Sequence, residues 1–535
     1  MGKYLIKRIL FSILSLLVVV GIVMILVYTA IHRDVVLQTD DLWNKKKEND
    51  RIYYEYTKYE DYGYLDIYDY GSFLKQKYTD LYASQGKSGE DFTKDPQYKE
   101  DQKAIEDEEK MAANATVQEF KAKYKNLDII FLEKKSYQNG RQKPGGKAYF
   151  FAVDEKSVFS RMVDYFTHII SFETTNQVKD PNLTKDQRYI RFEKDPYSWA
   201  GVALVGSGTL HKYLVYFDNR FPFIHQNLMH VNLGKSYTTN RGIEIIDVVT
   251  TPTGNFVQSY QQYPKWIGTD KTELTAKDFH TARYKPTDLT PLEKEQFYDN
   301  YAVLDLKVSG LTPVGISFVM GIIAVVIAYT FGIMLGILQA RHKDKLIDHL
   351  GNAYIVFVTA VPSLAYIFIV ASIGTQVFKL PLKFATANGR WVAYIMPIIS
   401  LSLGSIGGEM KWVRRYMIDQ MNSDYVKFAR AEGMSEREIY NIHIARNAMI
   451  YIVQGIPASV LFALGGALLT ERVYAVPGVG GKMIDALSSH DNAVIVAMTL
   501  IFTTIAIVGE ILGDLLLAKY DPRISLSSSS GGGRK

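Results

Sequence analysis

The sequence predicts a membrane protein of six transmembrane helices with an α+β domain inserted between the first two. Apolar residues gather in long runs near both ends of the 535-residue chain, and polar residues fill the stretch between them. A helix needs about 20 mostly apolar residues to cross a bilayer, and six runs reach that length. The runs are Ile9–Ile31, Val314–Leu338, Ala353–Phe378, Trp391–Met410, Ala448–Leu469 and Ala493–Leu517.

The first run is expected to stay in the mature protein as a membrane anchor. A cleaved signal peptide has a shorter apolar core, about 7–15 residues, followed by a small-x-small cleavage site. This run is longer, and its end at residues 28–32, Tyr-Thr-Ala-Ile-His, is a poor cleavage site. We therefore expect residues 1–32 to form the first transmembrane helix.

The distribution of Lys and Arg predicts that both termini are cytoplasmic. These residues gather in short loops on the cytoplasmic side of a membrane. With six spans, the N-terminus, the loops after the second and fourth spans and the C-terminus all fall on one side. All four are basic, and the opposite short loops carry fewer cations. Long domains escape this rule, so the insert at 33–310 is placed outside by the count of spans alone.

The insert is predicted to be an α+β extracellular domain. Its stretch from Lys87 to Lys123 is charged, which predicts helical or partly flexible structure, and strand-like runs follow it. The tyrosine density between Arg51 and Tyr70 would suit carbohydrate or peptide binding, but tyrosine also suits half-buried strands, and we favour that structural role. The strand-like runs are Leu127–Leu132, Ala148–Val153, Tyr189–Phe192, Tyr213–Phe217 and Ile243–Val249.

The composition argues against several functional classes. Cysteine is absent, which removes disulfides, thiolate metal sites and cysteine nucleophiles. A net charge of +5 without a dense basic tract gives no reason to expect nucleic-acid binding. The nearest approach to a phosphate-binding loop, at 477–482, lacks the first glycine and the hydroxyl residue of that motif. We expect no enzyme active site, metal or cofactor in this chain.

The loop at 413–447, after the fourth span, is the most informative segment. Tyr425, Phe428 and Ala429 are spaced i, i+3, i+4, which predicts one apolar helical face. The small side chains of Ala429 and Ala431 would let a partner approach closely. The alternative is a packed pair of interfacial helices with no partner.

A glycine divides this loop into two short helices. Gly433 permits a left-handed C-cap and a sharp turn. Ser435 can cap the next helix, whose first turn is acidic. Ile439, Ile442 and His443 are expected to continue an apolar face on the second helix.

This loop resembles the coupling loop of ABC-importer permeases, in the variant typical of dipeptide and oligopeptide permeases. The general motif is Glu-Ala-Ala, three residues, then Gly; aligned on Gly433, this chain has Lys427-Phe428-Ala429 and keeps only the second alanine. The Ala-Arg-Ala-x-Gly and His-x-x-Arg-Asn-Ala forms of the peptide branch match at 429–433 and 443–448. Tyr451 replaces a proline that is common in that branch.

Four further segments resemble the same branch. The resemblance covers residues 1–31 and about 311–525, and most of the insert exceeds the corresponding loop of typical members. A large insert there resembles the larger permease subunit of streptococcal-type oligopeptide importers, which implies a Gram-positive cell surface. The four segments are 3–10, Asn-Leu-Gly-Lys-Ser at 232–236, Ala-Val-Pro-Gly-Val-Gly at 475–480 and Asp-Pro-Arg at 521–523.

The resemblance implies an ABC type I importer permease fold and a multi-pass protein of the cell membrane. Residues 311–524 would form a five-helix core. Independently of the resemblance, the Ser/Gly-rich composition of 525–535 predicts a flexible tail or expression scar. The partners implied are a homologous second permease, two cytoplasmic ATPases that bind ATP and magnesium, an extracellular lipid-anchored peptide-binding protein and an oligopeptide substrate. ATPase closure would gate the pore.

The resemblance also implies two sets of functional residues. The residues expected to couple the ATPase are Ala429, Arg430, Ala431, Glu432, Gly433, Met434, His443, Arg446 and Asn447. Those expected in an outer turn near the pore are Pro477, Gly478 and Gly480. Two alternatives to this function are a membrane sensor with an extracellular ligand-binding domain and a secondary transporter that works alone. Neither explains the peptide-permease motifs, and co-purification of two ATPases and a second permease would decide between the three.

Overall fold

A computed structural model gives the structure of most of the chain. The C-terminal motif at 521–523, the tail at 525–535 and nearly all of 251–310 lie outside the described residues. The structure describes residues 2–38, 40–46, 48–87, 91–106, 108–138, 141–144, 147–177, 185–195, 199–209, 213–217, 223–238, 240–250, 261–262, 272–273, 311–384, 391–463 and 467–520.

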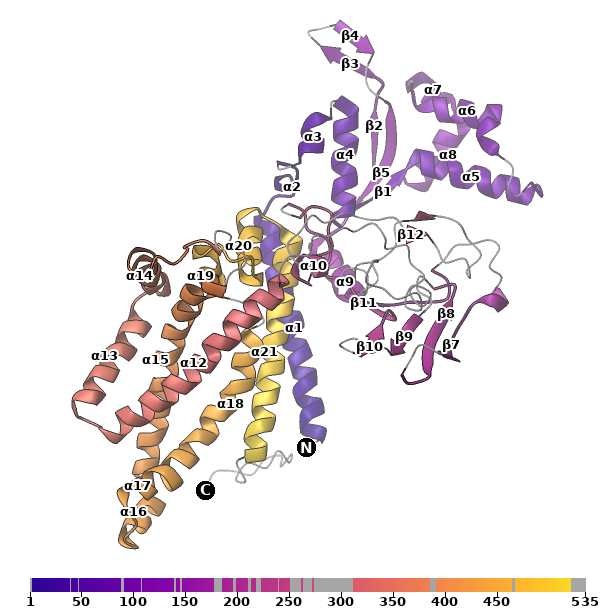
Figure 1. Cartoon of the computed structure of the whole chain (residues 1–535). Coiled ribbons are helices and arrows are strands. Elements are labelled where there is room, and N and C mark those ends of the chain that lie inside the picture. The colour runs from indigo at the N-terminus through magenta and orange to yellow at the C-terminus, as the bar shows by residue number, and fades with distance from the viewer. Residues whose placement is uncertain are drawn as a thin grey trace, which may run out of the picture.

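A bundle of long apolar helices forms one half of the molecule (Figure 1). Its helices are α1 (Gly2–Ala30), α12 (Pro313–Arg341), α13 (Leu346–Ala360), α14 (Ser363–Gln376), α15 (Ile395–Met421), α16 (Asp424–Ala431), α17 (Glu436–Glu438), η8 (Ile439–Ala445), α18 (Arg446–Phe462), α19 (Leu468–Val473), α20 (Val479–Ser488) and α21 (Asn492–Tyr520). Among the described residues, five helices are long and apolar enough to cross a membrane, and the bent pair α13–α14 makes six if it is one span. α1 begins and α21 ends at the end of the bundle that carries α16 and α17.

The third predicted span is wrong as a single helix. α13 ends at Ala360, α14 begins at Ser363, and the two helices meet at an angle of 108°. Pro362 lies at the break between the two helices. Proline disfavours a helical conformation in the residue before it and donates no backbone hydrogen bond, so α13 ends before it. The apolar composition continues through the break, which is why the run at 353–378 resembled one span.

A stripe of small residues brings α12 and α15 close together. Ala324, Ala328, Gly332 and Gly336 recur every four residues, so they share one face of α12, and all four are buried. A Cβ added at Gly332 would lie 2.5 Å from the Cβ of Glu409 on α15. Small residues of this kind allow helices in a membrane to associate by close van der Waals packing.

Between α1 and α12 lies the insert, a region of short helices and antiparallel strands (Figure 1). In its first part the elements are α2 (Val35–Gln38), α3 (Asp41–Lys45), α4 (Glu48–Asp61), β1 (Leu65–Asp69), α5 (Tyr70–Ser84), α6 (Pro96–Lys103), α7 (Glu108–Ala113), α8 (Ala115–Lys123), β2 (Asp128–Leu132), β3 (Lys135–Gln138), β4 (Arg141–Pro144) and β5 (Tyr149–Glu155). The second part contains α9 (Val158–His168), β6 (Ile170–Phe172), β7 (Tyr189–Lys194), β8 (Val202–Ser207), β9 (Tyr213–Phe217), β10 (Ile224–Gln226), β11 (Met229–Val231), α10 (Ile245–Thr250), β12 (Gln261–Gln262) and β13 (Thr272–Glu273).

The central strand β5 pairs antiparallel with β1 on one side and β2 on the other. Because side chains alternate along a strand, its two faces serve two different cores. Phe150 and Ala152 pack with α5 and α8, and Phe151 and Val153 pack with residues of α1, α4 and α21. The sheet thus joins the insert to the helix bundle.

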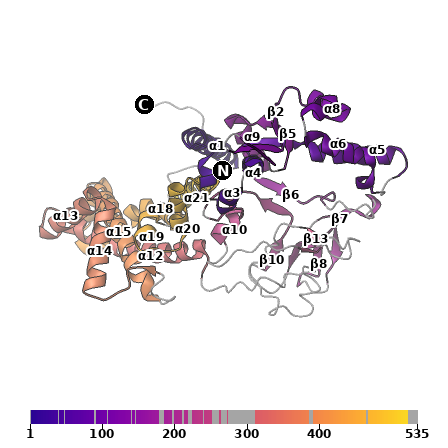
Figure 2. The same cartoon turned by 90° about the horizontal axis from the view of Figure 1, so that it is seen from above.

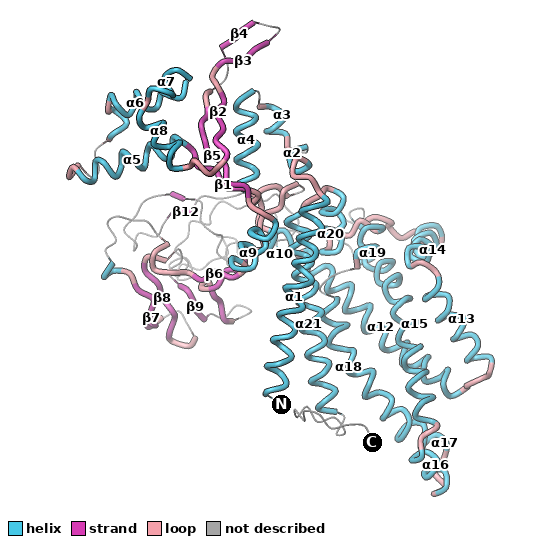
Figure 3. The backbone as a smooth tube through the Cα atoms, turned by 180° about the vertical axis from the view of Figure 1, so that it is seen from behind, coloured by secondary structure: helices cyan, strands magenta, loops and turns pink. Residues whose placement is uncertain are grey.

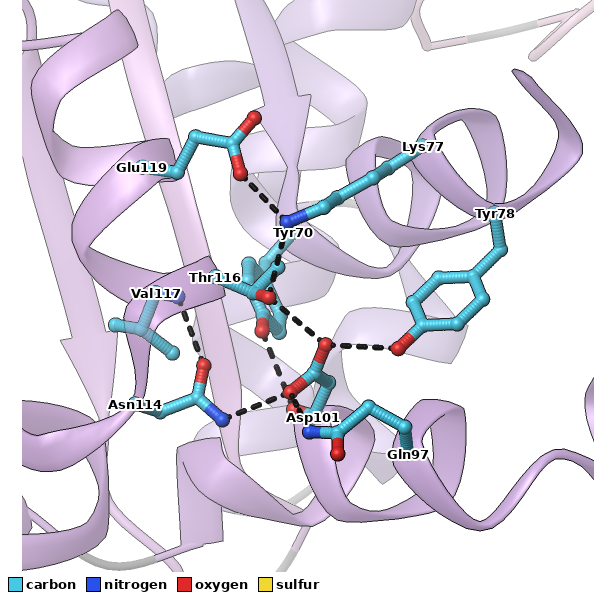
Figure 4. Close-up of polar contacts among 9 residues, drawn as sticks. All are labelled: Tyr70, Lys77, Tyr78, Gln97, Asp101, Asn114, Thr116, Val117 and Glu119. Carbon is cyan, nitrogen blue, oxygen red and sulfur yellow. Dashed lines mark hydrogen bonds and ion pairs between the residues drawn. The ribbon is translucent and has the colours of Figure 1, made fainter. Parts of the chain in front are cut away.

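A buried carboxylate joins the helices on the outer face of this sheet (Figure 4). The Asp101 side chain of α6 accepts hydrogen bonds from Tyr78 of α5 at 3.1 Å, Thr116 of α8 at 2.8 Å and Asn114 at 2.9 Å. Burial alone would raise the pKa of Asp101, but the hydrogen bonds to it outweigh burial and hold the pKa below its usual value. Because the carboxylate is hydrogen-bonded by side chains from α5, from α8 and from the residue that caps α8, this cluster is structural.

The second part of the insert contains the pair β6–β11 and a four-stranded antiparallel sheet in the order β10-β9-β8-β7. Strands are confirmed in the runs at 127–132, 148–153, 189–192 and 213–217. The strand predicted at 243–249 is wrong, because α10 occupies this segment. Its buried residues Ile245, Val248 and Val249 follow a helical i, i+3, i+4 spacing against the core, so packing overrides their β-branched preference.

The described part of the insert lies to the side of the bundle next to α1 and α21. Seen from above, it extends away from α13, α14 and α15 (Figure 2). The view from behind shows the same arrangement, with α1 and α21 between the insert and the other bundle helices (Figure 3).

Candidate functional site

The predicted coupling loop forms a compact unit at one end of the bundle, which we call the loop unit (residues 424–445). In α16 the buried residues are Val426 and Ala429, which pack with Val413 and Met417 of α15. Phe428, predicted on this apolar face, is 65% exposed instead. Ala429 is only 3% exposed, so its small size serves packing within the chain and not the approach of a partner.

The turn between α16 and α17 is confirmed in detail. Gly433 has φ +80°, the left-handed conformation that its lack of a Cβ permits. The amide of Met434 donates to the carbonyl of Ala429 at 3.2 Å, which closes the end of α16. Ser435 and Glu438 then form a capping box, in which each side chain bonds the other's backbone amide.

The second helix departs from the predicted face because η8 is a π-helix. Its i→i+5 hydrogen bonds change which side chains share a face. Ile439 and Ile444, five residues apart, are both buried, whereas Ile442 is 51% exposed and His443 is half-buried. The expectation that 439, 442 and 443 share one face is therefore wrong.

The outward surface of the loop unit is mixed in character. Phe428 and Ile442 are its large apolar side chains, and an exposed ion pair joins Arg430 to Glu436 with 2.9 Å between nitrogen and oxygen. The hydrogen bond that the Arg430 guanidinium donates to the Glu436 carboxylate raises the pKa of Arg430. Exposed pairs of this kind add little stability, so this one mainly orients Arg430 across the turn. Of the predicted coupling residues, those exposed are Arg430, Ala431, Glu432, Gly433 and Arg446, and those half-buried are Met434, His443 and Asn447.

The loop unit is fixed to three helices of the bundle. Its buried side chains pack on α15 and α18, and Arg341 at the end of α12 lies 5.5 Å from the ring centre of Tyr440. Nearby, Arg414 of α15 and Asp348 of α13 form a two-point ion pair with distances of 2.6 and 2.8 Å. A displacement of the loop unit would therefore reach several helices together.

The predicted outer turn lies at the opposite end of the bundle and surrounds a buried carboxylate. Glu471 of α19 accepts from the Ser317 hydroxyl at 2.7 Å and from the Gly481 amide at 2.8 Å. A Cβ added at Gly478 would lie 2.5 Å from Ser317 Oγ, and one at Gly480 would lie 3.1 Å from a Glu471 oxygen. Both glycines are buried, and Pro477 is half-buried. The glycines thus allow the turn to close on Glu471, a residue that the sequence analysis did not select.

A second buried carboxylate joins this end of the bundle to the insert. One oxygen of Asp491 accepts from the Ser236 hydroxyl at 2.7 Å and from the amides of Tyr237 and Thr238 at 2.8 and 3.0 Å. Its other oxygen caps α21 at Val494. The motif at 232–236 gave a signal for this segment, but nothing in the sequence pointed to its partner 255 residues away. Among the described residues, no group of three or more metal-ligating side chains is close enough to hold a metal ion.

Comparisons with known proteins show which families this sequence is similar to. Residues 332–526 match the family model described as a binding-protein-dependent transport system inner membrane component. The chain is 33% identical over 544 residues to the oligopeptide transport system permease protein AmiC of Streptococcus pneumoniae, which covers 99% of this chain and 100% of that protein. The dipeptide transport system permease protein DppB of Lactococcus lactis is 31% identical over 234 residues, 43% of this chain and 74% of that protein. The metal-staphylopine import system permease protein CntB of Staphylococcus aureus is 32% identical over 205 residues, 38% of this chain and 64% of that protein.

Proposed function

The chain belongs to the ABC-importer permeases of the dipeptide and oligopeptide family, and from this premise we propose that it forms one half of an oligopeptide translocation pore. A homologous permease supplies the other half, two cytoplasmic ATPases bind ATP and magnesium, and an extracellular lipid-anchored protein delivers the peptide. The observation that carries this proposal is the similarity to an oligopeptide permease along the whole chain, the insert included. A membrane sensor would not require that similarity.

In this proposal the outward surface of the loop unit binds an ATPase. Phe428 is the proposed anchor, because its large aromatic side chain is 65% exposed on the outward surface and aromatic residues of this kind are enriched among those that dominate binding energy at interfaces. Ala431 and Gly433, exposed beside it, leave room for close approach of the partner. Arg430, held by Glu436, adds an oriented charge at the rim.

ATPase closure would be transmitted through the buried side of the loop unit. Val426 and Ala429 pack on α15, and Ile444 continues into the packing of α18. Interfaces packed in this way move as rigid bodies rather than deforming continuously. Closure of the two ATPases would therefore swing α15 and α18 together and switch the pore between its two states.

The proposal is tested with Phe428→Asp in the assembled transporter. We expect peptide-stimulated ATP hydrolysis to fall at least tenfold, since truncating a central aromatic anchor typically costs about 2 kcal/mol or more. Lys427→Ala, the neighbouring exposed position, is the matched control and should change the rate less than about twofold. Unchanged stimulation in Phe428→Asp would reject this docking surface. Failure of two ATPases and a second permease to co-purify with the unmodified chain would reject the function itself.

We further propose that the insert is extracellular and helps to receive the peptide-binding protein. Its attachment through Asp491 lies next to α20 and the outer turn, at the end of the bundle opposite the loop unit. Charge reversal on the exposed α5–α8 surface should weaken docking of the binding protein without reducing basal ATP hydrolysis. Full docking after removal of that surface charge would count against this role.

A further inference from the structure

Helix α9, which packs beside α1, and the β6–β11 pair expose apolar side chains that we call together the insert patch. It consists of Phe159 and Val163 of α9, Ile170 and Phe172 of β6, and Met229 and Val231 of β11, all exposed. In the β6–β11 pair, Met229 lies opposite Phe172 and Val231 lies opposite Ile170, so these four side chains share one face. Exposed apolar side chains that gather on one face in this way indicate a binding surface.

The contacts of α9 with α1 show at which level along this apolar span α9 lies. Met162 packs on Gly21 so closely that an added Cβ there would lie 2.9 Å from the methionine methyl carbon. Arg161 stacks over Tyr28, with 3.6 Å to the ring centre. At 1.5 Å per residue, Gly21 and Tyr28 lie about 14 and 3 Å from the end of α1 at Ala30. Helix α9 is therefore level with the final part of an apolar span, Ile6–Ala30.

The face of α1 beside this contact is also apolar and exposed. Val18 and Ile22 are about half exposed, in the helix that belongs in the bilayer. Both Figure 1 and Figure 3 show α9 next to the upper part of α1, and Figure 3 shows β6 on the far side of α9 from α1. The insert patch thus continues a surface that already faces lipid, at a depth where amphipathic helices lie about 5–10 Å into the interface.

We propose that the insert patch lies in the membrane leaflet on the insert side, where its side chains contact the acyl chains of lipids. Arg161, sandwiched between Tyr28 and Tyr64, holds α9 against α1 from the side away from the lipid. The insert then contacts the membrane beside the bundle as well as α21. This proposal depends on the membrane location of α1 and not on the identity of the transported substrate.

A single-cysteine quenching experiment tests the proposal, because this chain has no cysteine of its own. Val163→Cys and Phe172→Cys carry a fluorescent label in the assembled transporter, reconstituted in phosphatidylcholine–phosphatidylglycerol vesicles. Val18→Cys is the control facing lipid. Leu81→Cys, an apolar position of similar exposure on α5, is the control facing water. Co-purification of the other subunits confirms that each labelled variant is folded.

We expect lipid-borne nitroxide to quench labels at 163 and 172 at least threefold more strongly than the label at 81, and iodide to show the reverse order. Quenching of both labels by iodide, as at 81, would overturn the proposal. Protection from both quenchers would also overturn it, since another protein surface would then cover the patch. Photoactivatable lipids provide a second measurement on the unmodified chain, and they should crosslink to peptides within 158–172; crosslinks confined to the bundle helices would contradict the proposal.

Discussion

Replacing Asp491 with alanine removes the acceptor that joins the insert to α21. The aspartate is 1% exposed, and one of its oxygens receives the Ser236 hydroxyl and the amides of Tyr237 and Thr238. Alanine leaves two backbone donors without this acceptor and removes the cap of α21. An unsatisfied buried donor costs about 1–3 kcal/mol, and a lost helix cap costs about 1 kcal/mol. These costs overlap, so we expect local opening of the junction to become easier by about 2–4 kcal/mol.

Hydrogen exchange at the amides of Tyr237 and Thr238 measures this opening directly in the assembled transporter. With 1.4 kcal/mol per factor of ten, exchange should accelerate roughly 30- to 1,000-fold. Asp485→Asn is the matched control, because it breaks an exposed ion pair with Arg472 at the same end of the bundle. Such a pair contributes about 0–1 kcal/mol, so exchange should change less than about fivefold. Equal exchange rates in Asp491→Ala and the unmodified chain would refute the junction.

Three further predictions follow from the geometry. At Gly433, rates of peptide-stimulated ATP hydrolysis should rank Gly, then Asn, then Val, because the left-handed conformation costs an ordinary residue about 1–2 kcal/mol and asparagine tolerates it best; a valine variant as active as asparagine would contradict this. Gly478→Ala should reduce the yield of folded transporter on size-exclusion chromatography, whereas Gly408→Ala, with open space around its Cβ, should not. Hydrogen bonds keep the pKa of Asp101 below its usual value, so its stabilisation of the α5–α8 lobe is complete above about pH 4 and is lost as the pH falls through the lower folded pKa. Exchange in α8, corrected for its intrinsic rate, should therefore rise on acidification in the unmodified chain and much less in Asp101→Asn.

Local chemistry in the sequence was enough to predict the turn of the loop unit. The left-handed cap at Gly433 and the cap at Ser435 depend on residues within one or two turns of helix, and the structure confirms both. The reciprocal bond from Ser435 to Glu438 was not predicted. Strand β5 is also confirmed, since it lies where the run Ala148–Val153 predicted a strand. The conformation of residues that depends on their neighbours in the sequence could therefore be predicted.

Features that depend on contacts between residues far apart in the sequence could not be predicted from the sequence. The i, i+3, i+4 rule could not show that Phe428 faces outward. Which face of α16 is buried depends on the packing of α15 against it, and that packing cannot be read from the residues of α16. The π-helix displaced Ile442 from the predicted apolar face, and no residue pattern distinguishes it from an α-helix. Glu471 and Asp491 are ordinary acidic residues in the sequence, and their roles arise from donors brought to them by folding. Pro362 gave a local signal that the apolar count overrode.

The burial of Ala429 has a practical consequence for mutational scanning of this loop. Its side chain touches its own protein, so large substitutions there would lower transport by misfolding the loop even if the ATPase never contacts that position. A scan that scores transport alone would rank Ala429 beside Phe428 and assign both to the interface. Scoring abundance of the folded protein alongside transport separates the two, since only Phe428 variants should lose transport at normal abundance.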